Sequence, residues 1–198
     1  MRVGSGDFIY EFIPSWGILP PGYEFSAVPD GAVDAQGRVY VFSRSSHPVM
    51  VFDAEGNFLK SWGEDLFKRP HGACMTPDAF YCVDDKGHAV RKCTLDGELL
   101  MTLGTFGQPS DTGYDGKHWR TITRPGPPFN RPTSLALAPT GEIYVSDGYG
   151  NCRVHKFSAD GKLLFSWGEP GTGPGQFSIV HTLRVDKQGI VYVADPVR

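Results

Sequence analysis

At 198 residues, 40% of them hydrophobic, the chain is long enough to bury a core and is expected to form one domain. Its formal net charge is −3, and acidic and basic residues are interspersed without a run of either sign. Nucleic acids and anionic membranes are bound by clustered lysines and arginines, so neither is an expected partner.

The N-terminal residues lack the apolar core of a signal peptide, and nowhere do about 18 apolar residues run together. The sequence as it stands therefore predicts a cytoplasmic location. No C-x-x-C pair occurs, so a zinc-knuckle or redox motif is not expected. We expect buried free thiols at all four cysteines: Cys74, Cys82, Cys93 and Cys152.

In chain order, short apolar runs alternate with turns that contain glycine. Residues 7–17 resemble the end of a repeat. Complete repeats are expected at 26–63, 72–104 and 133–168, and the first half of another at 182–198. The strands expected in the first complete repeat are 27–33, 38–42, 49–53 and 58–62.

A tyrosine marks one position of this repeat and recurs roughly every 40 to 50 residues, apart from an insertion at 105–131. Four strands per period predict an all-β fold, a β-propeller of four-stranded blades, with material here for about four blades. A β-sandwich is the alternative, but it would not repeat the same order of motifs. Residues 7–17 are expected to complete the blade begun by 182–198, which would remove a sheet edge.

Alternating strand direction places short glycine turns on one face of such a propeller and the long, irregular loops on the other. Loops on a rigid scaffold commonly carry binding and catalysis. The insertion joins this second face, and its Tyr114, His118 and Trp119 are expected either to form a lid over a substrate or to be disordered. Three aspartates that follow equivalent strands are interpreted as structural caps: Asp84, Asp147 and Asp195.

Several segments carry a family resemblance: SRSSHPVMVFD, FKRPHGACM, PFNRPTSLALAP, YVSDGYGNCRVHKFS and WGEPGTGPGQFSIVHTLRVD. Over nearly its whole length the chain resembles the NHL-repeat catalytic domain of peptidyl-α-hydroxyglycine α-amidating lyase. The resemblance implies a six-bladed propeller with a catalytic zinc ion and a structural calcium ion. It also implies cleavage of the N–Cα bond of a C-terminal α-hydroxyglycine in a peptide or small amide, which gives an amide and glyoxylate.

By the same resemblance, His71 and His181 match two of the three zinc-binding histidines, Tyr149 the proposed base and Arg44 an active-site arginine. The residues are compatible with these roles. His71 and His181 each precede an innermost strand, so both imidazoles are expected to face the central channel, and neutral imidazole is a good zinc ligand. Arg44 is suited to hold a substrate carboxylate with two parallel hydrogen bonds.

Each of these residues also has a structural interpretation, as a loop histidine satisfied by carbonyls, a packed tyrosine or a solvated arginine. His47 is a reserve ligand, and His155 is given no role. The chain departs from the family in having about four blades instead of six, Gly150 where secreted members have a cysteine, and Pro196 after Asp195. A homo-oligomer that completes the ring is one expected solution, and a noncatalytic NHL propeller that binds a protein or ligand is the alternative function.

Overall fold

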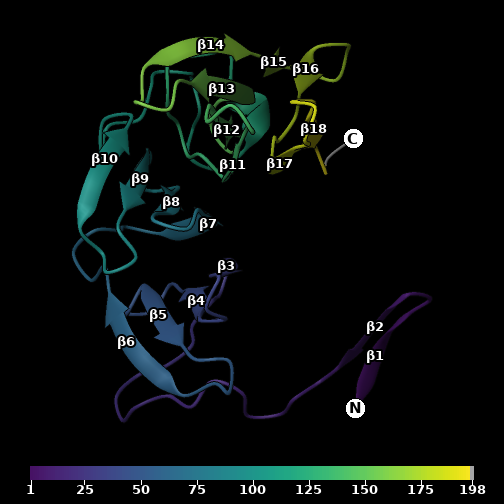
Figure 1. The fold of residues 1–198 in the computed structure, drawn as a ribbon. Coiled ribbons are helices and arrows are strands. Elements are labelled where there is room, and N and C mark those ends of the chain that lie inside the picture. The colour runs from purple at the N-terminus through teal and green to yellow at the C-terminus, as the bar shows by residue number, and fades with distance from the viewer. Residues whose placement is uncertain (197–198) are drawn as a thin grey trace.

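The computed structural model describes residues 1–196; positions 197 and 198 of the expected last repeat lie outside them. The described chain is all-β apart from one 3₁₀ turn, Trp119–Thr121 (Figure 1). No helix between residues 1 and 196 has the length and apolar character needed to cross a bilayer. The predicted fold class, a β-propeller of four-stranded blades, is confirmed.

Three antiparallel sheets, each meandering through four consecutive strands, form the blades. The first blade contains β3 (Asp30–Val33), β4 (Val39–Phe42), β5 (Val49–Phe52) and β6 (Phe58–Trp62). The second contains β7 (Pro70–Met75), β8 (Phe80–Asp84), β9 (Ala89–Cys93) and β10 (Leu99–Leu103). The third contains β11 (Ser134–Leu137), β12 (Ile143–Asp147), β13 (Arg153–Phe157) and β14 (Leu163–Trp167).

Two shorter sheets follow the third blade. Strands β15 (Glu169–Pro170) and β16 (Gln176–Phe177) form a small parallel pair. Strands β17 (Thr182–Val185) and β18 (Val191–Ala194) are the first two strands of a further sheet. The repeat pattern therefore located the strands within a few residues, and β6 matches its predicted bounds.

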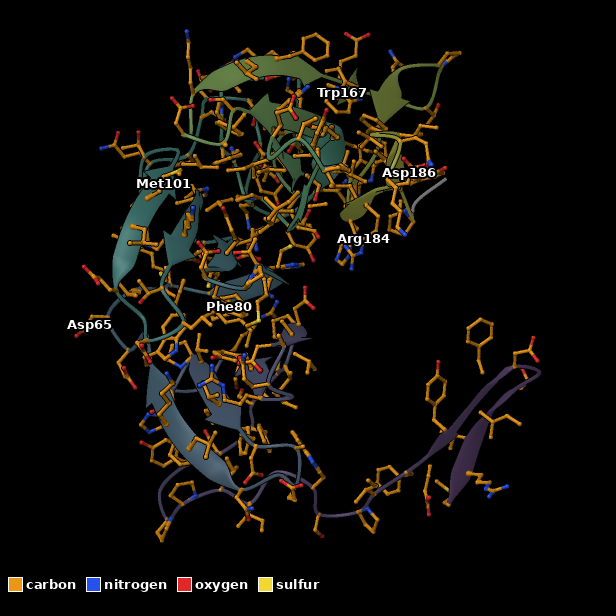
Figure 2. The ribbon with its side chains drawn as sticks, in the orientation of Figure 1. Asp65, Phe80, Met101, Trp167, Arg184 and Asp186 are labelled. Carbon is orange, nitrogen blue, oxygen red and sulfur yellow. The ribbon has the colours of Figure 1, made fainter. Side chains whose placement is uncertain are left out.

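The innermost strands β3, β7, β11 and β17 pack side by side in that order, and the outer strands fan away from them (Figure 1). The core lies between the blades, where the facing sides of adjacent sheets pack together. Phe80 illustrates this: it belongs to the second blade, and its ring lies 5.6 Å from that of Tyr40 in the first (Figure 2). Every residue of β8 is buried for the same reason.

The N-terminal segment differs from the prediction. Strand β2 (Phe8–Glu11) pairs with β1 (Arg2–Ser5) in a separate hairpin, which Figure 1 shows away from the blades and away from β18. Among the described residues, 7–17 therefore do not complete the sheet of β17 and β18. Beyond the hairpin the chain rejoins the body, where the indole nitrogen of Trp16 donates a hydrogen bond of 3.1 Å to the carbonyl of Ala54.

Candidate functional site

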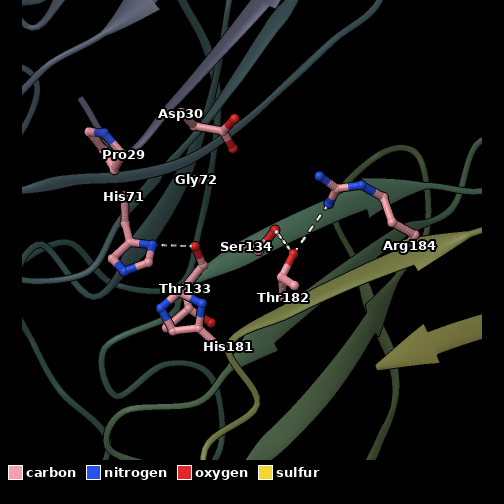
Figure 3. A pocket seen from close by; sticks show the side chains of 9 residues that line it. All are labelled: Pro29, Asp30, His71, Gly72, Thr133, Ser134, His181, Thr182 and Arg184. Atoms are coloured by element: carbon pink, nitrogen blue, oxygen red, sulfur yellow. Dashed lines mark hydrogen bonds between the residues drawn. The ribbon is translucent and has the colours of Figure 1, made fainter. Parts of the chain in front are cut away.

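Equivalent positions of successive blades converge on the axis of the propeller. They carry Asp30, His71, Thr133 and His181, each at or just before an innermost strand. With their neighbours, these four residues line an axial cavity of 220 Å³ (Figure 3). The predicted convergence of His71 and His181 on the central channel is thus what the structure shows.

Three of the loops that carry these residues, those before His71, Thr133 and His181, are held by aspartates that end or follow the second strand of their own sheets. Their carboxylates accept hydrogen bonds from backbone N–H groups two or three residues before the axial position, which fixes the path of the loop. Asp84 accepts from Lys68 and Arg69, Asp147 from Asn130, and Asp195 from Ser178 and Ile179. The interpretation of these aspartates as structural caps is confirmed.

His71 lies in a β-bulge, because the pairing of β7 with β8 shifts register between Pro70 and Ala73. A bulge redirects side chains, and here it turns the imidazole towards the third blade. The next residue is glycine for a packing reason: a Cβ on Gly72 would lie 2.7 Å from the carbonyl oxygen of Thr133. This close approach of β7 and β11 lets His71 Nδ1 reach the same oxygen at 2.7 Å (Figure 3).

That contact fixes the protonation of His71. A carbonyl oxygen can only accept a hydrogen bond, so Nδ1 of His71 carries the hydrogen and the lone pair of Nε2 is left free to accept one. Burial is the largest cause that lowers the pKa of His71 to about 4, so the ring is neutral at pH 7. A neutral imidazole with a fixed tautomer is the form that binds metal ions.

The phenol oxygen of Tyr149 lies between the two histidines, 3.0 Å from His71 Nε2 and 3.1 Å from His181 Nε2. Since His71 Nε2 accepts, the phenol donates to it, and His181 Nε2 donates to the phenol oxygen. Burial, and secondly Asp85, raises the pKa of the Tyr149 phenol, while Arg69 and other nearby arginines lower it. Three side chains from different blades therefore meet at one point.

Arg44 lies beside this group and is half-buried. Its Nε donates to the carbonyl oxygen of Pro70 at 2.9 Å, one residue before His71. Burial first, and then Arg69, lowers the pKa of Arg44. No carboxylate of residues 1–196 forms an ion pair with it, so its remaining donors are available to an anion.

The insertion forms the wall of a second cavity, of 410 Å³, which also contacts Tyr149. Tyr114, His118 and Trp119 line it. Hydrogen bonds hold the insertion against the loop of Tyr149: Thr112 Oγ1 donates to the carbonyl of Gly150, and Asn151 Oδ1 accepts from the N–H of Gly126. The insertion is therefore ordered.

Three residues of this region were not predicted from the sequence. Asp85 is fully buried and forms ion pairs with both Arg69 and Arg131. The two arginines occupy the same position of consecutive repeats, each directly before a proline (RPHG and RPTS). An alignment of the repeats would therefore have identified both arginines.

Other histidines are held away from the axis. The ring of His47 stacks on Tyr23 with centroids 3.7 Å apart, so it is not a reserve ligand in this structure. His155 is fully buried, with Nε2 3.2 Å from Asp147 Oδ2 and Nδ1 2.8 Å from Ser166 Oγ. Both histidines have structural partners, and the absence of a predicted role for His155 agrees with this.

The side chains at the axial site supply part of the ligand set of a zinc ion. Two imidazole Nε2 atoms approach one point, which suits the tetrahedral nitrogen coordination of zinc. The part of the chain that the structure describes contains no group of three or more His, Cys, Asp or Glu side chains with ligand geometry. The described residues thus supply two nitrogen ligands and a phenol oxygen, and no third histidine.

Comparison with known proteins identifies the repeat. Residues 129–157, which include Tyr149, match the family model "NHL repeat". The chain is 36% identical over 177 residues to NHL repeat-containing protein 3 of Mus musculus, an alignment that covers 83% of the chain and 48% of that relative. The chain is an NHL-repeat protein.

It is also 30% identical over 175 residues to peptidyl-alpha-hydroxyglycine alpha-amidating lyase 2 of Drosophila melanogaster, over 75% of the chain and 40% of the relative. The expected resemblance to amidating lyases is confirmed. The chain spans about half the length of NHL repeat-containing protein 3 and less of the lyase.

A solved structure titled "Streptogramin B lyase structure" superposes with a TM-score of 0.64 at 13% identity, covering 91% of the chain and 51% of that structure. At this identity the likeness establishes the fold, which is the propeller arrangement described above.

Proposed function

We propose that this NHL-repeat chain carries the site of an amidating-type lyase, which converts an N-acyl-α-hydroxyglycine into the corresponding amide and glyoxylate. The observation that supports this is the contact of the Tyr149 phenol with both His71 and His181, two residues that line the axial cavity. A relative named as an amidating lyase, similar over three quarters of the chain, supports the same reaction.

The reaction needs one proton to move and one bond to break. The hydroxyl proton leaves, its oxygen forms a carbonyl with Cα, the N–Cα bond breaks, and the amide nitrogen takes up a proton. Tyr149 is proposed as the group that accepts the hydroxyl proton and returns it to nitrogen, in the phenolate form that bound zinc and Arg44 would favour. Its oxygen contacts both histidines, and general acid–base groups act at hydrogen-bond distance. Arg44 is proposed to hold the substrate carboxylate, since its guanidinium lacks a carboxylate partner among the described residues.

Zinc is the proposed cofactor, held by the Nε2 atoms of His71 and His181, and its binding would require the hydrogen of His181 to lie on Nδ1 and not on Nε2. When bound, it would acidify the substrate hydroxyl and lower the pKa of nearby groups. Calcium is proposed as a structural ion only through the resemblance to the lyases, and no described residues mark its site.

The deciding experiment measures glyoxylate released from α-hydroxyhippurate by purified protein loaded with zinc, together with zinc content by mass spectrometry. We expect stoichiometric zinc and turnover, with both lost in His71→Ala and in His181→Ala. His47→Ala is the matched control, because that ring stacks on Tyr23 outside the cavity, and it should retain zinc and activity. Absence of glyoxylate from the zinc-loaded, folded protein would exclude the lyase.

A further inference from the structure

The cavity beside Tyr149 has a marked charge bias. Its lining contains three cationic residues, Arg69, Lys117 and Arg131, and no carboxylate. Asp85 is buried and is shared by the two arginines. Lys117 forms no ion pair with any described residue, although the exposed Asp115 lies near it and accepts a hydrogen bond from its backbone N–H. The lining of the cavity itself is therefore cationic.

Contacts on several sides fix the position of Arg131 in the cavity wall. Its backbone is in the left-handed region, with φ of 61°, and its N–H donates to His88 Nδ1 at 3.1 Å. Its Nη1 lies 3.4 Å from the Tyr114 hydroxyl, and its guanidinium carbon lies 5.3 Å from the centre of the Tyr149 ring. Within residues 1–196 the Nε of Arg131 is buried and has no hydrogen-bond partner, so contact with a ligand in the cavity falls to the terminal nitrogens of this fixed cation.

Apolar surface flanks these cations. Tyr114, Trp119 and Ile179 line the same cavity, and the Trp119 ring is oriented by the guanidinium of Arg120, 4.7 Å from its centre. Aromatic rings beside fixed cations suit a ligand that has a short carbon chain and an anionic end.

Resting on the proposed function, we infer that this cavity receives the N-acyl part of the substrate and favours acyl groups that carry a carboxylate. The hydroxyglycine carboxylate is assigned to Arg44, so the preferred substrate has two carboxylates, one on each side of the scissile N–Cα bond. Arg131 and Lys117 contact the second carboxylate, and Trp119 covers the carbon chain between them.

Matched pairs of compounds test this inference. N-succinyl- and N-butyryl-α-hydroxyglycine have acyl chains of the same length and differ in the distal carboxylate. We expect kcat/KM to favour the succinyl substrate about tenfold, equivalent to about 1.4 kcal/mol. Lys117→Gln and Arg131→Gln should each reduce that ratio. Arg124→Gln is the control: it is in the same insertion but pairs with Asp111 and does not line the cavity, so the ratio should persist.

A binding experiment separates this inference from the lyase proposal. The unreactive N-succinylglycine and N-butyrylglycine are titrated by calorimetry at low and high salt. Tighter binding of the succinyl compound that weakens with salt and with Arg131→Gln supports the inference even if no glyoxylate is ever released. Equal dissociation constants, or equal kcat/KM values in an active enzyme, would overturn it while leaving the lyase proposal intact.

Discussion

The imidazole rings of His71 and His181 lie with their centroids 5.2 Å apart, although one begins the second blade and the other precedes β17. The phenol of Tyr149 contacts both rings. The roles proposed for these residues, and the packing that positions them, lead to four measurable expectations.

Replacing Tyr149 by phenylalanine removes only the oxygen that bridges the two histidines. We expect glyoxylate release to fall by about 10²-fold or more, the usual loss when a general acid–base group is removed, while zinc content stays the same. Turnover is followed with α-hydroxyhippurate, and Tyr144→Phe, on a strand of the third blade, serves as the control. Activity within a factor of two of the unchanged protein would show that Tyr149 is structural.

Asp147 is expected to be critical for stability. Its buried carboxylate accepts hydrogen bonds from the Asn130 N–H at 3.0 Å and from Asn151 Nδ2 at 2.7 Å. In Asp147→Asn, the new side-chain NH2 group replaces one acceptor oxygen and leaves a buried N–H donor of Asn130 or Asn151 without an acceptor. The free energy of unfolding should therefore fall by about 2–3 kcal/mol. Urea unfolding measures this change. Asp160→Asn, at an exposed turn, should change the value by at most about 0.5 kcal/mol, and a similar loss in both variants would contradict the argument.

Gly148 has no room for a side chain. A Cβ at this position would lie 2.6 Å from the carbonyl carbon of Val180, the residue before His181. Gly148→Ala should therefore push these two loops apart and cost about 1–3 kcal/mol, the usual range for overpacking. The same urea experiment, with zinc titration as a second readout, checks this. Gly173→Ala, which meets only the flexible end of Gln176, is the control and should be nearly neutral.

The buried thiols predict a pH dependence. Burial raises the pKa of Cys93 to about 11 and, with smaller contributions from Asp195 and Asp147, that of Cys152 to about 12. The unfolded thiols ionise near 9.0, so the contribution to stability is complete below that pH and is lost as pH rises from about 9 towards 11 and 12.

Unfolding free energies at pH 8 and pH 10 measure this loss, and Cys152→Ala should show a shallower decline than the unchanged chain. The folded protein should also react slowly with Ellman's reagent at pH 8, because thiolates are the reactive form. A decline that is identical in Cys152→Ala, or rapid labelling of all four thiols, would show that these groups are not shielded.

Much of this architecture follows from local sequence patterns. The apolar runs around Tyr40, Tyr81 and Tyr144 reflect strands that are buried on both faces. Glycines such as Gly161, with φ of 88°, close the hairpins between the runs. The convergence of His71 and His181 was predictable because repeated units place equivalent positions around one axis.

What the sequence did not reveal depends on contacts between distant loops. Asp85 forms an ion pair with Arg131 of the next repeat, and although aligning the repeats marks the arginines, no local pattern specifies which carboxylate they contact. The N-terminal segment was mispredicted for a related reason: Phe8–Glu11 has the composition of a blade strand, but strand composition does not specify the partner, which here is Arg2–Ser5.

The contacts that join axial residues of different blades also have a kinetic consequence. Each sheet is a meander of sequence neighbours and can form early, whereas the contacts of Tyr149 with His71 and His181 span long stretches of chain and need loop closure first. The cavity should therefore be among the last features to appear during refolding. Recovery of ligand binding would then report the docking of the blades, and strand formation alone would leave the protein without a site.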